Sequence, residues 1–282
     1  MRAVGCEGGA AAPLSAIAAV SASAVAIVLC AGLMHIVVTS KASAAAELTA
    51  RIVAALLARN PRLVLGLPTG RTTIPFYRSL VALHQRGEAD FAQATTFNLD
   101  EFAGIDARHP ASYHAYMRAH LFDHVNLAPA RIHLPRGDAR DWRAEIARYE
   151  RALAEAGGMD VVVLGIGRNG HIGFNEPADR LDARTHRVKL HATSRRANAH
   201  LFGGRMRDVP GHAISMGLAT ILEARLVLLL ATGSDKARIL SRALAGPITT
   251  RVPASLVRLH PAAVAVLDQA AAARLPSGVT AQ

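Results

Sequence analysis

Cysteine and lysine are both scarce in this chain of 282 residues. The two cysteines, Cys6 and Cys30, stand in the first thirty positions, so the rest of the chain lacks the thiols that disulfides, iron–sulfur clusters or a cysteine nucleophile require. Only Lys41, Lys189 and Lys236 are lysines, although the net charge is +11, and the arginines are spread along the chain. We attribute this excess first to an arginine- and alanine-rich composition, then to attraction for a small anion, and place nucleic-acid binding last.

Patterns typical of metal sites are missing as well. The thirteen histidines are scattered, and the one pair at close helical spacing, His120 and His124, has neither the glutamate nor the third ligand of a zincin. We therefore expect no metal site in this protein.

One long run without charge extends from Gly8 to Met34 and includes the apolar stretch 10–33. Its length fits a membrane span or a secretory leader. However, Arg2 is the only basic residue ahead of it, and the alanine, serine and glycine that dominate it insert weakly into membranes. We favour a third interpretation, in which translation starts at Met34 and residues 1–33 lie outside the fold. This interpretation predicts a cytoplasmic protein without stable membrane association.

From residue 34 onward, short β-branched or leucine-rich runs alternate with amphipathic stretches of helix length, which is typical of an α/β fold. The continuous apolar runs at 161–164 and 226–230 indicate buried parallel strands. No repeat or linker divides the chain, so we predict a single domain over 34–282, with a mostly parallel Rossmann-like sheet and helices on both faces. The expected strands are 35–38, 63–67, 94–98, 160–165, 225–231 and 263–267. The expected helices lie near 42–59, 72–86, 110–123, 140–156, 193–203, 211–221 and 234–245.

Two of the expected strands end in turns that suit an anion, TGRTT at 69–73 and TGSDK at 232–236. Small and hydroxyl residues at a helix start offer backbone N–H groups and the positive end of the helix dipole to a phosphate. A plain capped turn is the alternative for the first segment, because threonine is common at helix starts. Lys236, in the second turn, is a suitable partner for an anion bound at the first.

Two adjacent carboxylates, Asp100 and Glu101, follow the strand expected at 94–98. One of them could act as a general base if it were partly withdrawn from water. The alternative, which this motif alone favours, is a capping aspartate followed by a solvated glutamate.

The strand expected at 160–165 leads into GIGRNGHIGFNEP at 165–177, which has four glycines in nine residues. Such glycines allow an unusual backbone path and present His171 and Glu176 close to it. A histidine with a carboxylate five residues away can form an oriented acid–base pair. Dinucleotide binding is disfavoured, because the glycine pattern runs into His171 and Phe174 rather than into a helix start.

Taken in order, these segments resemble the glucosamine-6-phosphate deaminase family, whose superfamily also includes 6-phosphogluconolactonases and sugar-sensing regulator domains. The resemblance covers roughly residues 34–268, and its most specific pieces are LGLPTGRTT, TTFNLDEFAGI with HPASYHAYMRAHLFDHVNL, and GHIGFNEP. It implies isomerisation and hydrolytic deamination of glucosamine 6-phosphate to fructose 6-phosphate and ammonia, without a metal or organic cofactor. The expected partner is this amino-sugar phosphate. The preference between gluco and galacto epimers and the oligomeric state, a homo-oligomer included, stay open.

The resemblance also implies roles for individual residues. Asp100 matches the base that takes the C2 proton and returns one to C1. His171 matches the group that opens the sugar ring, with Glu176 holding and charging it. The positions that match the phosphate site are Thr69, Gly70, Arg71, Thr72 and Lys236.

Three features depart from the family pattern. Asn169 stands where some members have an aspartate, so a full Asp–His–Glu relay is not implied. His186 and Val188 stand where regulated bacterial members have a basic pair for an allosteric effector, which argues against that control. His200 falls in the register of a phosphate-binding arginine, for which one arginine of the pair at 195–196 could substitute.

Two rival functions belong to the same superfamily. A 6-phosphogluconolactonase should carry a loop that reads roughly GHTASLFP, which GHIGFNEP does not match. A non-catalytic sugar-phosphate sensor should be attached to a DNA-binding module, but no helix-turn-helix pattern precedes residue 34 and the acid–base residues are present. We therefore expect an enzyme.

Overall fold

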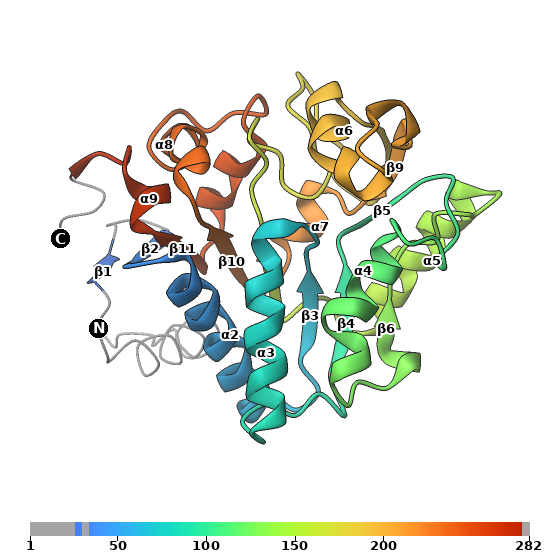
Figure 1. The fold of residues 1–282 in the computed structure, drawn as a ribbon, viewed down its shortest axis with the longest axis horizontal. Helices are drawn as coiled ribbons and strands as arrows, with labels where there is room; N and C mark the ends of the chain where they lie inside the picture. Colours follow the sequence, from blue (N-terminus) through green and yellow to red (C-terminus); the bar gives the residue numbers. More distant parts are fainter. Residues whose placement is uncertain (1–25, 30–33, 278–282) are drawn as a thin grey trace, which may run out of the picture.

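An eight-stranded sheet forms the centre of the molecule, in the strand order β1-β2-β11-β10-β7-β3-β4-β6 (Figure 1). The computed structural model describes residues 26–29 and 34–277, and every structural statement refers to these residues. Neighbouring strands from β2 to β6 are parallel, whereas β1 runs antiparallel to β2. The strands are β1 (Ala26–Leu29), β2 (Met34–Thr39), β3 (Val64–Leu67), β4 (Thr95–Asn98), β6 (Ile132–His133), β7 (Val161–Leu164), β10 (Leu226–Ala231) and β11 (Ala263–Asp268).

The six strands expected from the sequence are all present in this sheet, whereas β1 and the two-residue β6 were not predicted. Their continuous apolar sequences reflect burial on both sides. In β10, every residue from Leu226 to Ala231 is buried, and the same is true of β7. Parallel strands of this kind need a helical layer on each face, because their backbone connections cross over the sheet.

Helices do cover both faces, which confirms the predicted fold class. One buried cluster joins α2, α3 and α4 to Leu65 of β3, and Figure 1 shows α2 and α3 in front of the sheet. The second cluster joins α5, α7, α8 and α9 to alternate residues of the same strands, including Val162 of β7. The α-helices are α2 (Ala42–Arg59), α3 (Ile74–Gln85), α4 (Tyr113–His120), α5 (Trp142–Glu155), α6 (Ala192–Asn198), α7 (Leu218–Leu222), α8 (Ala237–Leu244) and α9 (Gln269–Ala272).

A second, three-stranded antiparallel sheet was not foreseen. It consists of β5 (Asp100–Phe102), β9 (His212–Ser215) and β8 (His186–Lys189), in the order β5-β9-β8. The helix predicted over 211–221 is therefore wrong in its first half, where β9 pairs with a strand on either side. Strands of three or four residues carry too little periodicity to be recognised, and pairing partners distant in sequence decide their conformation.

Leu99 links the small sheet directly to the large one. Leu99 separates the end of β4 from Asp100, the first residue of β5. The Leu99 backbone N–H donates to the Leu67 carbonyl of β3, and its carbonyl accepts from Met216 after β9. The carboxyl end of β4 is thus fixed to both sheets at the point where Asp100 begins.

The predicted leader lies mostly outside the described residues, and only Ala26–Leu29 within it is seen, as the edge strand β1. The exclusion of residues 1–33 from the fold therefore stays a prediction. Across the part of the chain that the structure describes, no helix has the length and apolar character needed to cross a membrane.

Candidate active site

The carboxyl ends of β10, β7, β3 and β4 lie side by side in the sheet, and each is followed by one of the segments singled out from the sequence. In a parallel sheet, ligands bind beyond these ends, where loops and helix starts face a common space. In Figure 1, β3 points toward α6 and the small sheet, which lie beyond this edge.

The turns after β3 and β10 share one backbone design. Gly70 has φ 117° and ψ 168°, Gly233 has φ 92° and ψ 149°, and each precedes a 3-10 turn that continues into a helix. Positive φ with extended ψ is a conformation that glycine adopts readily and other residues avoid. These turns occupy the first residues of the helices predicted at 72–86 and 234–245, whose α-helical parts begin at Ile74 and Ala237.

Three tyrosine hydroxyls hold the turn after β3. Tyr77 donates to the Pro68 carbonyl, and Tyr116 donates to the Gly70 carbonyl over 2.7 Å. Tyr113 forms a side-chain hydrogen bond with Thr69, and burial, followed by the charge of Asp100, raises the pKa of Tyr113 well above its ordinary value. The turn is therefore held in place by side chains from α3 and α4.

Positive charge collects where the two turns face each other. Lys236 is half-buried and its Nζ donates to the Ile166 carbonyl over 2.8 Å. Burial is the main cause that lowers the pKa of Lys236, and the charges of Arg168 and Arg71 lower it further, against the opposing effect of Asp235. Arg168 forms an ion pair with Asp235, whereas none of the described acidic residues pairs with Arg71. An anion bound here would relieve this repulsion.

Asp100 is the exceptional carboxylate of the site. Its side chain is buried, and its Oδ1 has no hydrogen-bond partner among the described residues. A Cβ placed on Gly173 would lie 3.5 Å from Asp100 Oδ2, so the loop after β7 passes directly over this carboxylate. Burial, with a smaller contribution from Glu101, raises the pKa of Asp100 to about 8. A buried carboxylate without partners is unfavourable for stability and is typical of a functional group.

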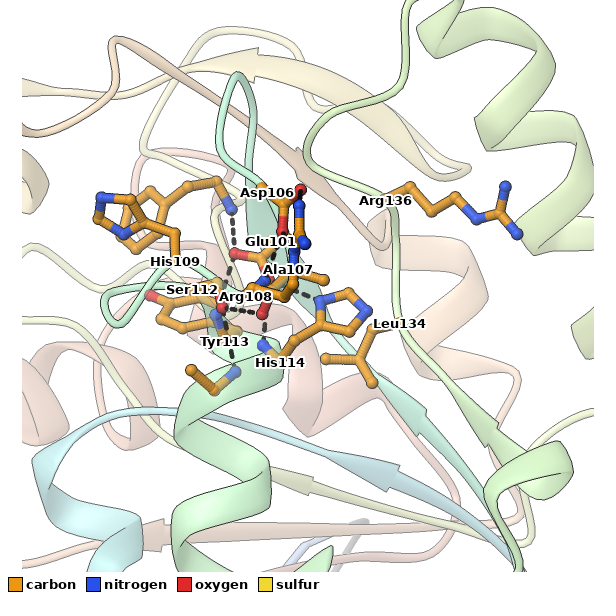
Figure 2. A network of polar contacts seen from close by, with 12 residues as sticks. Glu101, Asp106, Ala107, Arg108, His109, Ser112, Tyr113, His114, Leu134 and Arg136 are labelled. Atoms are coloured by element: carbon orange, nitrogen blue, oxygen red, sulfur yellow. Dashed lines mark hydrogen bonds and ion pairs between the residues drawn. The ribbon is translucent and has the colours of Figure 1, made fainter.

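Glu101, the neighbouring carboxylate, has a structural role (Figure 2). Its Oε1 accepts from the backbone N–H groups of Phe102 and Tyr113. Its Oε2 accepts from the His114 backbone N–H and lies 3.0 Å from His114 Nδ1. Glu101 therefore satisfies donors at the start of α4, where Ser112 also caps the helix. The alternative offered by the sequence, a capping Asp100 followed by a solvated Glu101, is therefore wrong, because Glu101 is buried and binds the start of the helix.

The glycine-rich loop after β7 gives His171 its place. A Cβ on Gly167 would come within 2.2 Å of the His171 ring, so only glycine allows this close approach. Gly170 and Gly173 have positive φ values of 94° and 57°, which turn the chain sharply on either side of the histidine. The Gly167 N–H donates to the His171 carbonyl and closes the loop.

Glu176 is buried beside His171 and collects several donors. His171 Nδ1 lies 3.5 Å from Glu176 Oε2, and Asn169 Nδ2 donates to the same oxygen over 2.7 Å. The Ser194 hydroxyl donates to the other oxygen, Oε1. Burial alone would raise the pKa of Glu176, but the hydrogen bond and charge of His171, with Ser194 and Asn169, outweigh it and lower the pKa to about 2. The carboxylate is thus an anion that orients His171.

Two candidates for a further phosphate contact, Arg195 and His200, lie in and directly after α6. His200 is exposed in a 3-10 turn after α6, and its Nδ1 lies 2.9 Å from the Ala197 carbonyl. Arg195 donates to the carbonyls of Met206 and Val209 and so braces that segment. The phosphate role of His200, like the roles of Thr69, Gly70, Arg71, Thr72 and Lys236, stays a prediction.

Two groups of positioning residues were missed from the sequence. The tyrosines around the first turn include Tyr113 and Tyr116, whose spacing of three places them on one side of α4, and this spacing could have indicated a shared role. Ser194, which touches both Glu176 and His171, carried no recognisable signal. No cluster of three or more potential metal ligands occurs among residues 26–29 and 34–277.

Comparison with known proteins agrees with this arrangement. Residues 39–266 match the family described as glucosamine-6-phosphate isomerases/6-phosphogluconolactonase. Glucosamine-6-phosphate deaminases of Halothermothrix orenii and Rhodopirellula baltica are 46% and 48% identical, over 80% and 77% of this chain and 93% and 86% of theirs. A solved monomeric glucosamine-6-phosphate deaminase is 40% identical with a TM-score of 0.82, and the match covers 86% of this chain and all of that one.

More distant structures share only the fold. A 6-phosphogluconolactonase from Trypanosoma cruzi is 17% identical with a TM-score of 0.67, over 88% of this chain and 98% of that one. At such identity the match says nothing about the reaction. The family match and the relatives above 40% identity are decisive: the chain belongs to the glucosamine-6-phosphate isomerase/6-phosphogluconolactonase family and, within it, to the glucosamine-6-phosphate deaminases.

Proposed function

We propose that this protein isomerises glucosamine 6-phosphate and hydrolyses it to fructose 6-phosphate and ammonia. The observation that carries the proposal is Asp100, a buried carboxylate with an unpartnered oxygen. It lies under the glycine-rich loop after β7, at the same edge of the sheet as the turns after β3 and β10. A proton transfer between neighbouring sugar carbons needs one base of this kind, and a phosphate needs the cationic turns beside it.

The reaction follows from these residues in three steps. His171, oriented by Glu176, moves a proton between the ring oxygen and the anomeric hydroxyl, which opens the sugar ring. Asp100 removes the proton from C2 and returns one to C1, which converts the open chain through an enolamine to a ketimine. Water then adds to the C2 carbon of the ketimine and ammonia leaves, so that a keto group remains at C2.

Raised basicity suits Asp100 to its step. Because burial raises the pKa of Asp100 to about 8, its ionised form is a stronger base than an exposed carboxylate. The substrate carries a cationic amino group next to the carbon that loses its proton, and this charge favours the ionised form of Asp100 when the two meet. Substrate binding and activation of the base are therefore coupled.

Two other functions of the superfamily find less support. The lactonase alternative rests on structures below 25% identity, which share only the fold with this chain. The sensor alternative needs no buried base, yet Asp100 is kept buried and unpartnered at a cost in stability.

Ammonia release from glucosamine 6-phosphate should persist in EDTA, because the proposed proton transfers use only side chains. The measurement is ammonia from purified protein with and without the chelator, with galactosamine 6-phosphate as the parallel substrate for epimer preference. Complete loss of activity on chelation, restored by zinc, would contradict this prediction.

Substitution of Lys236 by glutamine should raise KM by roughly 10- to 100-fold, because a charge-assisted hydrogen bond is worth about 1.5–3 kcal/mol. The proton transfers use other residues, so kcat should change much less. Lys41→Gln is the control, since Lys41 is an exposed lysine that follows β2, and β11 separates β2 from β10 in the sheet. An unchanged KM in Lys236→Gln would remove Lys236 from the phosphate site.

A chain that begins at Met34 should remain folded and as active as the full chain. The proposed site lies at the ends of β10, β7, β3 and β4. β1 is an edge strand of the sheet, and β2 and β11 separate it from β10. Removal of Ala26–Leu29 leaves the edge of β2 unpaired, which should weaken resistance to heat more than activity. An insoluble or inactive shortened chain would revive a membrane or structural role for the leader.

The working environment follows from the substrate. We propose a cytoplasmic location, because a phosphorylated sugar is charged and does not cross membranes unaided. The proposed site is built from one chain, so it does not require a homo-oligomer. The related solved enzyme is described as monomeric. Light scattering of the purified protein tests the oligomeric state.

A further inference from the structure

A second pocket lies outside the proposed active site, between the small sheet and the start of α5. Its volume is about 450 Å³, within the range of small-molecule sites and larger than a free phosphate ion needs. Gly104 and Gly137 form part of its wall. The side chains that decide its chemistry are Arg140, Trp142, Arg187, His212 and Asp138.

The wall formed by the small sheet is positively charged. Opposite residues of paired antiparallel strands share a face, and here Arg187 stands opposite Ile214 and Lys189 opposite His212. Three basic side chains therefore project on the same side of β8 and β9. Burial lowers the pKa of His212, and the charges of Arg187 and Lys189 lower it further. At neutral pH the charge of this face is therefore that of Arg187 and Lys189, which stand two residues apart on β8.

The described part of the protein supplies little negative charge to this wall. No described carboxylate forms an ion pair with Arg140, Arg187 or Lys189, and Asp138 is the single acidic residue of the lining. Glu101 stands on the same sheet face, opposite Ile214, but its oxygens are occupied at the start of α4. The pocket thus keeps an uncompensated positive charge.

Trp142 closes the other side. The Arg187 guanidinium lies 5.9 Å from the centre of the Trp142 ring, and Arg143 lies 5.3 Å from it. Stacking on an aromatic ring restrains the guanidinium and leaves its N–H groups free to bind an anion. Arg143 contacts the same ring but does not line the pocket.

We propose that this pocket is a second anion site, which binds a phosphate monoester of the size of a small sugar phosphate. Two arginines supply the bidentate donors that phosphate oxygens prefer, and the remaining volume accommodates the organic part. The site differs from the effector positions of regulated relatives, because His186 and Val188 alternate with Arg187 and point to the opposite face of β8, where Val188 packs against the core.

The chain offers a direct probe, because Trp142 is its only tryptophan. Tryptophan emission of the full-length protein is followed during titration with inorganic phosphate and with glucose 6-phosphate, at constant ionic strength maintained with chloride. We expect a saturable change with both, and tighter binding of the ester. Tighter binding of inorganic phosphate, or no saturation with either up to about 10 mM, would overturn the proposal.

Variants distinguish this pocket from the active site. Arg187 and Arg140 are both exposed, and Arg187→Gln and Arg140→Gln should each lower the affinity for the ester by about tenfold or more. Arg143→Gln is the matched control, which should alter the initial emission but not the affinity. Lys236→Gln, a change in the proposed active site, should leave the affinity measured by tryptophan emission unchanged. This result is expected whether or not the proposed function is correct. Native affinity in both Arg187→Gln and Arg140→Gln would overturn the proposal.

Discussion

Asp100→Asn should abolish deamination and keep the contacts to the phosphate, so that binding loses only the attraction between Asp100 and the amino group. Asparagine keeps the size of the side chain but cannot accept the C2 proton, and a positioned general base contributes about 10²- to 10⁴-fold to a rate. The turns after β3 and β10, which we propose hold the phosphate, are not altered by this substitution. The decisive measurement is solvent-deuterium incorporation into the substrate carbon, followed by NMR, with ammonia release in parallel.

Glu101→Gln is the matched control, because it makes the same chemical change one residue away. Glu101 accepts four donors at the start of α4, so its loss should lower the free energy of unfolding by roughly 1–3 kcal/mol. Deuterium exchange should continue in the folded fraction of this variant. The opposite pattern, with native exchange in Asp100→Asn and none in Glu101→Gln, would transfer the role of base to Glu101.

The sequence predicted six of the eight strands of the large sheet and singled out the segments that follow four of them. Apolar runs such as Val161–Leu164 record burial on both faces, and the glycines after β7 record a backbone path that other residues cannot follow. Since chemistry in such sheets gathers at the carboxyl ends of strands, motifs far apart in the sequence could be assigned to one region before their contacts were known.

The parts that escaped prediction depend on contacts between distant segments. The strand at His212–Ser215 exists because β5 and β8 pair with it, and neither partner is adjacent in sequence. Ser194 reaches Glu176 only because α6 lies over the loop after β7. The residue pattern alone did not distinguish Asp100 from Glu101, since two neighbouring carboxylates differ only in where the folded chain directs them. The family resemblance assigned the base to Asp100, and that role stays a prediction.

Ionisation of Asp100, which the proposed reaction needs, should destabilise the folded protein. Burial raises the pKa of Asp100 to about 8 in the folded state, whereas the unfolded value is about 3.9. Between these two values the folded protein holds a proton that the unfolded chain has lost. The free energy of unfolding therefore falls as pH rises from about 4 to about 8, and is constant beyond.

Asp100→Asn removes this titration, and the variant should therefore be more stable than the native protein at pH 8 by a few kcal/mol, on the order of 5 at most. At about pH 4 the neutral carboxyl and the amide are equivalent, so the difference should vanish. Glu176, whose pKa is lowered to about 2, loses stabilising charge in acid, but it does so in both proteins and cancels from the comparison. Urea unfolding of both proteins at a series of pH values measures this difference directly. A constant difference across the series would show that Asp100 is not held in its buried, proton-binding state, and the account of it as a base activated by burial would fail.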